Sequence, residues 1–208
     1  MTTATLTRPK TIHEIIPKTI WRDGVLVIGF ALFTALMSQI SIPLSFTPVP
    51  ITGQTLAVLL SGAVLGPYLG ASSQTLYVFL GAIGLPFYAE GTSGWSVLKA
   101  PSGGYLIGFI FASALVGYLS NKKNDRNVLS AIAAFVAGSI VIYTFGLIWL
   151  AHVLKIPMTA AVGKPSAIAY GLAPFVIGDV IKATMAGVLL PTSWKIVQKF
   201  DSKMKDEN

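Results

Sequence analysis

Long stretches without charge alternate with short clusters of charged residues along this chain. Four stretches are free, or nearly free, of Asp, Glu, Lys and Arg: residues 24–89, 100–121, 127–154 and 165–194. A helix that crosses a bilayer needs about 20 predominantly apolar residues. The last three stretches therefore predict one membrane-spanning helix each, and the first is long enough for more than one.

Proline divides the longest stretch into shorter segments. Proline lacks an amide hydrogen, clashes with the preceding helical turn and disfavours a helical residue before it. Breaks are therefore expected at Pro43, Pro67 and Pro86. Residues 46–50 contain two prolines and are expected to form an extended loop. The helices that remain in this stretch are 24–42, 51–65 and 68–85.

The predicted fold is an all-α integral membrane protein with six membrane-spanning helices. The second of them, residues 51–65, has only 15 residues and is short for a span. Short, interrupted segments flank binding sites in several transporters. A tilted helix in a locally thin membrane is the alternative, and both interpretations stay open.

The composition agrees with a membrane protein and excludes several kinds of site. Hydrophobic residues make up 53% of the chain and charged residues 11%, against about 25% charged residues in soluble domains. There is no Cys, and His13 and His152 lie far apart, so neither disulfides nor a metal centre or other cofactor is expected. The chain lacks the P-loop of ATPases and the G-x-S-x-G and H-E-x-x-H signatures of hydrolases, so it is not expected to be an enzyme.

Basic residues concentrate on one predicted side of the membrane. With six spans, both termini and the loop at 122–126 share a side, and this side holds eleven of the fifteen Lys and Arg residues. Cytoplasmic loops carry such an excess. The sequence therefore predicts a cytoplasmic segment at 1–23, a cytoplasmic-membrane domain at 24–194 and a cytoplasmic charged tail at 195–208. The net charge of +7 then reflects topology and lipid contact rather than nucleic-acid binding.

Asp179 and Lys182 form the only ionisable pair inside a predicted span. A charge at the bilayer centre costs about 2.5–3.5 kcal/mol on insertion scales and usually marks a functional site. Residues three apart share one helix face, so the two side chains can meet; a purely structural ion pair is the alternative. If the last helix begins near Gly171, Asp179 lies about 12 Å along it, in the outer half of the membrane.

Two loops are expected to open on the same outer side as this pair. One covers residues 41–52, with Gln54 just inside the next helix, and the other covers residues 85–102. Both are rich in small, hydroxyl-bearing or aromatic residues, which suits a pocket for a small ligand. Each loop taken alone could equally be an ordinary extracellular turn.

Ala31 and Ala35 form a small-xxx-small pair on the first predicted helix. Small residues let a second helix approach closely. The pair predicts either internal packing or a docking face for a partner membrane protein.

Five motifs occur in a characteristic order and spacing. They are PVPITGQT at 48–55, GAVLGP at 62–67, GAIGLP at 81–86, PSGGYLIG at 101–108 and G-D-x-x-K at 178–182. Together they resemble the BioY family, the biotin-binding substrate-capture (S) components of energy-coupling-factor (ECF) transporters. The resemblance covers about residues 24–191. It implies the S-component fold, an outward-facing biotin pocket, and partnership with a transmembrane coupling protein and two cytoplasmic ATPases.

The resemblance also assigns ligand-binding roles to individual residues. Asp179 and Lys182 match the family's pair for the ureido ring of biotin, and Ala31 with Ala35 matches its docking motif. Thr92, Ser93 and Gly94 match the loop that covers the ligand and meets its acyl chain. Gln54 and Tyr105, which lie in the first and fourth motifs, are the further residues predicted to bind ligand.

The partner of the biotin carboxylate is less well defined. Some family members use an Asn and an Arg where this chain has Thr92 and Leu106. Lys99 is the only base on the 85–102 loop and is a hypothesis for this role; an exposed loop charge is the alternative.

Three other functions stay in view. An S component for another small vitamin would share the fold. An intramembrane hydrolase is disfavoured, because Asp179 is the only acid in a predicted span and aspartyl protease chemistry needs two carboxylates. A structural subunit without a ligand is the third.

Overall fold

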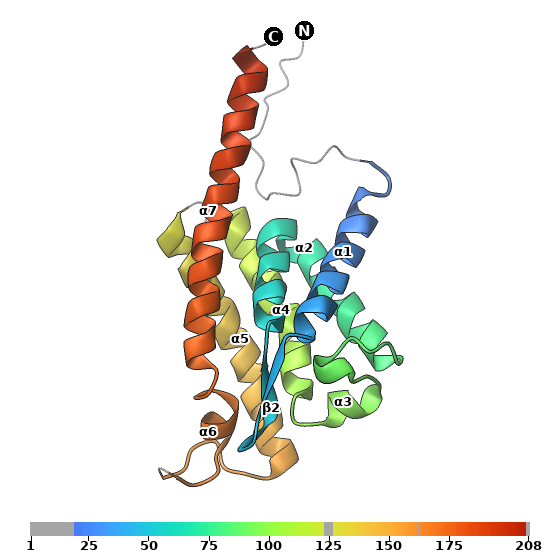
Figure 1. Cartoon of the computed structure of the whole chain (residues 1–208), viewed down its shortest axis with the longest axis vertical. Helices are drawn as coiled ribbons and strands as arrows, with labels where there is room; N and C mark the ends of the chain where they lie inside the picture. The colour runs from blue at the N-terminus through green and yellow to red at the C-terminus, as the bar shows by residue number, and fades with distance from the viewer. Residues whose placement is uncertain (1–18, 123–126, 162, 207–208) are drawn as a thin grey trace.

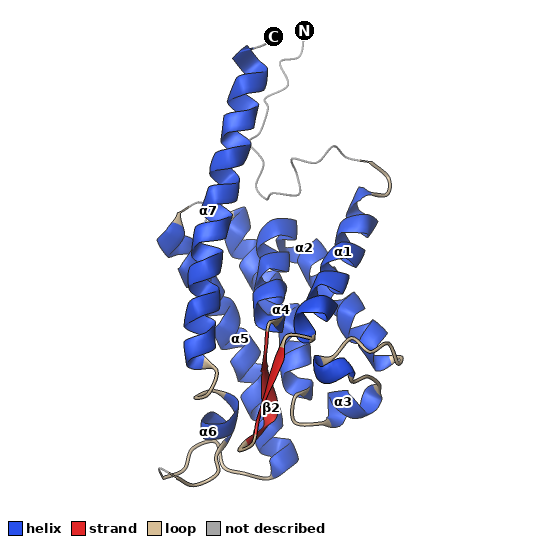
Figure 2. Cartoon of the chain, viewed as in Figure 1, coloured by secondary structure: helices blue, strands red, loops and turns tan. Residues whose placement is uncertain are grey.

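The computed structural model describes residues 19–122, 127–161 and 163–206. Residues 1–18 of the predicted N-terminal segment, and 207–208 of the predicted tail, lie outside the described residues. Helices make up most of the molecule, with a two-stranded sheet between them (Figure 2). The elements in chain order are α1 (Arg22–Ser38), β1 (Ser41–Leu44), β2 (Thr47–Thr52), α2 (Gln54–Ala82), the 3-10 helix η2 (Ala89–Gly91), α3 (Trp95–Lys99), α4 (Gly103–Asn121), α5 (Val128–Leu154), α6 (Ala167–Gly171) and α7 (Val176–Asp206).

The long helices form a bundle. Within the described ranges, α2, α4 and α5 are long and apolar enough to cross a membrane. The start of α1 and the end of α7 lie at the same end of the molecule, and α7 extends beyond the bundle there (Figure 1). α6 and the sheet lie toward the opposite end (Figure 1). The expectation of a helical membrane protein is confirmed at this level.

Helix α2 is two helical segments that fold back on each other. Gly66 interrupts it with φ 80° and ψ −179°. The Gln54 side chain donates a hydrogen bond to the hydroxyl of Tyr77, whereas 23 residues of straight helix would separate the two by about 35 Å. The break predicted at Pro67 is therefore confirmed, and the segments on its two sides are antiparallel.

Residues 41–52 form an antiparallel hairpin in which Ser41 pairs with Thr52 and Leu44 with Thr47. The extended conformation was expected here, but the preceding helix is shorter than predicted. It ends at Ser38 instead of continuing to residue 42. The Ile40 carbonyl accepts from the Gly53 amide at 3.0 Å, so backbone pairing at the base of the hairpin replaces the last helical turn.

The segments of α2 pack closely on α4 because glycines line the contact. A Cβ atom added to Gly62 would collide with the Ser113 carbonyl oxygen, and one added to Gly117 would collide with the Gly66 carbonyl carbon. Ala31 and Ala35 on α1 are also buried, at 0% and 7% exposure. Small side chains thus allow α1, α2 and α4 to approach at close range.

The last helix begins later than the sequence indicated. A start near Gly171 was expected, but α6 ends at that residue and α7 begins at Val176. Pro174 lies between them and cannot donate a helical hydrogen bond, which favours a new helix start just after it. Asp179 is consequently in the first turn of α7, not about 12 Å along a longer helix.

Candidate functional site

The Asp179–Lys182 pair lies in the first two turns of α7. The Lys182 Nζ is 3.3 Å from the Asp179 Oδ1, and the side chains are 17% and 14% exposed, respectively. The free N–H groups at the start of a helix carry partial positive charge and favour an anion in the first turn. Their three-residue spacing predicted that the two side chains can meet, and the structure shows them in contact.

Two neutral side chains on other elements complete this cluster. The Tyr143 hydroxyl on α5 donates to the Asp179 Oδ2. The Lys182 Nζ donates to the Thr55 Oγ1 on α2 at 2.7 Å. Three elements far apart in the sequence thus converge on one ion pair. Sequence analysis did not single out either Thr55 or Tyr143, although Thr55 is the last residue of the PVPITGQT motif.

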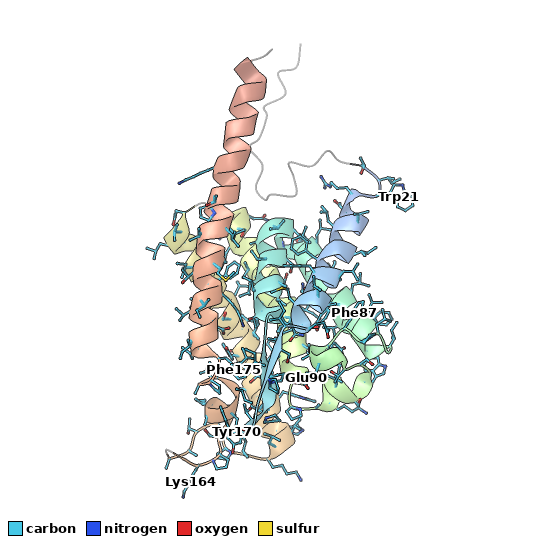
Figure 3. All side chains as sticks on the ribbon, in the orientation of Figure 1. Trp21, Phe87, Glu90, Lys164, Tyr170 and Phe175 are labelled. Atoms are coloured by element: carbon cyan, nitrogen blue, oxygen red, sulfur yellow. The ribbon has the colours of Figure 1, made fainter. Side chains whose placement is uncertain are left out.

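A pocket opens beside the pair, between the hairpin, the α2 start, the 85–102 loop, α4, α5 and α7. Its lining combines hydroxyl, amide and ionisable groups with apolar side chains. The lining residues are Val49, Pro50, Thr52, Gln54, Thr55, Tyr88, Ala89, Thr92, Val97, Ser102, Tyr105, Leu106, Phe109, Ile142, Tyr143, Phe175, Asp179 and Lys182. Figure 3 shows Phe175 at the base of α7 and Glu90 on the loop across from it.

Five of the eight residues predicted to bind ligand line this pocket. They are Gln54, Thr92, Tyr105, Asp179 and Lys182. Ser93, Gly94 and Lys99 are absent from the lining, and Lys99 is exposed at the end of α3. Their roles toward a ligand stay predictions.

Gln54 and Tyr105 are held in place by hydrogen bonds. Gln54 accepts from the Thr52 hydroxyl at 2.8 Å and donates to Tyr77. The Tyr105 hydroxyl donates to the Gly171 carbonyl at 2.9 Å, and its ring meets that of Tyr143 edge to face, with centroids 6.4 Å apart. Hydrogen bonds within the chain therefore hold these two polar side chains of the pocket in place.

The 85–102 loop is tied to α1 and α2. Ser38 donates to the Phe87 carbonyl at 2.6 Å, and the Gln39 side chain donates to the Tyr88 carbonyl at 3.2 Å. The Tyr88 hydroxyl donates to the Val78 carbonyl at 2.6 Å. Burial raises the pKa of Tyr88 to about 12, so the ring stays neutral at physiological pH. These bonds fix the loop against the bundle where Thr92 enters the pocket.

Ala31 and Ala35 lie in the hydrophobic core. Their burial corresponds to the internal-packing alternative, since both side chains are covered by this chain in the conformation described. The docking role of the pair stays a prediction.

The cluster offers binding groups rather than reactive ones. Within the described ranges, no three His, Cys, Asp or Glu side chains come together as a metal site requires. The pair supplies a carboxylate acceptor and an ammonium donor, and the hydroxyls and Gln54 add further hydrogen-bonding groups.

Comparison with known proteins connects this geometry to a family. The family model described as "BioY family" matches residues 7–199. This chain belongs to the BioY family. The resemblance inferred from the five motifs is thereby confirmed.

Individual relatives agree in sequence and in structure. The chain is 38% identical to "Biotin transporter BioY" of Rhizobium etli over 176 residues, covering 81% of this chain and 90% of that protein. It is 38% identical to the Thermotoga maritima protein of the same name, covering 78% and 92%. A solved structure titled as the S-component for biotin from an ECF-type ABC transporter is similar with a TM-score of 0.76 and 28% identity, over 86% of this chain and 95% of that one. The likeness therefore extends across most of the chain.

Proposed function

We propose that this chain is the biotin-binding substrate-capture subunit of an ECF-type transporter for biotin uptake. It is a transporter component and not an enzyme. The observation that carries the proposal is the largely buried Asp179–Lys182 pair in the wall of a pocket, in a chain similar to a solved structure titled as an S-component for biotin.

The chemistry of biotin fits this wall. Its ureido ring presents two N–H donors and one carbonyl acceptor. Asp179 accepts from one ring N–H and Lys182 donates to the carbonyl, so the neutral ring completes the hydrogen bonding of a pair that is neutral in sum. Phe109, Ile142 and Phe175 line the same pocket and cover the thioether ring and acyl chain.

The remaining predicted site residues take supporting roles in this proposal. Gln54 and Tyr105 shape the polar wall, and Thr92, with the adjacent Ser93 and Gly94, meets the acyl chain. Lys99 attracts the carboxylate from the rim of the loop. No cofactor is required for capture of the ligand.

The membrane arrangement follows from the same assignment. In this proposal α1, the two segments of α2, α4, α5 and the first part of α7 form six spans, and the membrane domain covers residues 24–194. Both termini are cytoplasmic and the pocket faces outward. A transmembrane coupling protein and two cytoplasmic ATPases supply the energy for release of biotin into the cell.

Titration of the detergent-purified chain with labelled biotin tests this function. We expect saturable binding at one site per chain, and mass spectrometry of the protein as purified is expected to detect biotin. Asp179→Asn and Lys182→Ala should each weaken binding by about a hundredfold, because each leaves the other charge without its partner in a largely buried site.

Competition with other vitamins provides the control. Unlabelled biotin should displace the label, whereas other vitamins in excess should not. Displacement by a different vitamin with higher affinity would assign the site to that vitamin. Undiminished biotin binding in both Asp179→Asn and Lys182→Ala would show that the pair does not bind the ligand.

A further inference from the structure

We propose that Tyr143 and Thr55 are positioning residues that hold Asp179 and Lys182 in their ligand-binding orientations before biotin arrives. The proposal rests on the proposed function, because it concerns the same pocket. Neither side chain is ionised, and each contacts one member of the pair from a different element. They act on the ligand through the charged residues.

The contact of Tyr143 fixes the carboxylate of Asp179. Its hydroxyl donates to Oδ2, while Lys182 lies against Oδ1. A carboxylate has about four acceptor positions, so two donors leave acceptor positions for a ligand N–H. The edge-to-face contact with Tyr105 holds the Tyr143 ring in place, so the carboxylate plane is set by the bundle.

The contact of Thr55 fixes the ammonium of Lys182 in the same way. Lysine has a long, flexible side chain, and its ordering costs conformational entropy. The Thr55 Oγ1 accepts one Nζ proton at 2.7 Å and Asp179 accepts another at 3.3 Å. An ammonium has three donors, so the third is free for a carbonyl oxygen.

Because the Asp179–Lys182 pair is largely buried, its contacts with Tyr143 and Thr55 affect the affinity for the ligand. Both charged side chains are more than four-fifths covered, and electrostatic contacts there are stronger and more sensitive to geometry than in water. A group that is ordered before binding does not lose further freedom when the ligand binds. Loss of either neutral partner is therefore expected to lower affinity for the ureido ring in particular.

Tyr143→Phe is the first test, with Tyr68→Phe as its matched control. Both changes remove one tyrosine hydroxyl, but Tyr68 lies on α2, is 85% exposed and does not line the pocket. Dissociation constants are measured for biotin and for the two singly N-methylated biotins, each of which lacks one ureido N–H. Wild type should prefer biotin over at least one methylated analogue.

We expect Tyr143→Phe to weaken biotin binding by about tenfold, as for loss of a hydrogen bond to a charged group. It should also shrink the preference for biotin over the methylated analogue, because a poorly oriented carboxylate distinguishes N–H from N–CH₃ less well. Tyr68→Phe should keep the wild-type preference. A role limited to folding would change the fraction of active protein and leave this preference intact.

Thr55→Val and Thr55→Ser form an independent second test. Valine keeps the shape but removes the acceptor for Lys182, so affinity and ring preference should both fall. Serine restores the acceptor and should recover both. This series stays informative if Tyr143→Phe does not fold.

The outcomes separate this inference from the proposed function. Absence of biotin binding by the wild-type chain would overturn the function itself. Wild-type binding with an unchanged ring preference in Tyr143→Phe and Thr55→Val would overturn the positioning role alone. An equal fall in preference for Tyr68→Phe, or no recovery in Thr55→Ser, would also overturn it.

Discussion

Single residues at the start of α2 show how a buried polar group depends on one distant partner. Gln54 is 6% exposed, and its amide donates to Tyr77, which is fully buried on the other segment of the same helix. Tyr77→Phe would leave that amide without this acceptor. An unsatisfied buried group costs about 1–3 kcal/mol, so we expect a thermal unfolding midpoint in detergent lower by several degrees.

Tyr68→Phe is the matched control for this prediction. Tyr68 lies on the same helix but is 85% exposed, so removal of its hydroxyl should leave the midpoint unchanged. Equal midpoints for the two variants would show that the Gln54–Tyr77 bond does not stabilise the fold.

Some residues of the site can be predicted from the sequence and others cannot. Asp179 and Lys182 could be predicted because charge is rare in an apolar stretch and costly in a bilayer. Tyr143 has no such signal, since a tyrosine in a helix such as α5 is ordinary. Its contact with Asp179 spans 36 positions along the chain, and only the packing of α5 on α7 brings the two together.

Among the elements, the reversal within α2 depends on one glycine conformation. Gly66 has φ 80° and ψ −179°, a region that is essentially restricted to glycine. Gly66→Ala should therefore destabilise the fold by about 1–3 kcal/mol, measured as chemical or thermal unfolding in detergent.

Gly29→Ala is the control for the Gly66→Ala prediction. It lies inside α1, and a Cβ atom there would have no heavy atom within 4 Å. This change should stabilise the helix by about 0.5–1 kcal/mol, the opposite direction. Destabilisation of the same size in both variants would contradict the special role of Gly66.

The hairpin at 41–52 should act as a cover for the pocket. Val49, Pro50 and Thr52 line the pocket, and Thr47 near the tip of the hairpin donates to the Tyr170 carbonyl at 2.8 Å. Figure 3 labels Tyr170 close to this tip. Thr47→Val removes the bond, so we expect biotin to dissociate roughly two- to tenfold faster.

Stopped-flow dissociation of labelled biotin measures this effect, and hydrogen exchange of residues 41–52 measures the opening directly. Ser45→Ala is the control, because Ser45 lies exposed in the hairpin turn. Faster exchange without faster dissociation would show that the hairpin does not limit biotin release.

The elements were predictable where proline and charge mark them. The break beside Pro67 follows from the missing amide hydrogen, and the long apolar stretches coincide with the long helices. The pairing of β1 with β2 was not predicted. The two prolines indicate an extended backbone, but they do not show which strand it pairs with. The separate start of α7 was not predicted, although Pro174 just before it disfavours a continuous helix.

At the scale of the whole molecule, the placement of charge predicts which end faces the cytoplasm. Lys122 follows the end of α4, while Lys164 lies beyond the end of α5, and both are exposed. The 27 residues of α5 between them span about 40 Å, enough to cross a bilayer. Figure 3 shows Lys164 at the end of the molecule opposite to Trp21.

Single cysteines test this orientation cleanly, because the chain has no Cys of its own. In intact cells, Lys164→Cys should react with a membrane-impermeant maleimide, whereas Lys122→Cys should react only after the membrane is opened, since the basic side faces the cytoplasm. The unmodified chain is the control for background labelling. The reverse pattern would invert the topology and turn the pocket inward, and labelling of both cysteines in intact cells would place them on one side and contradict a spanning α5.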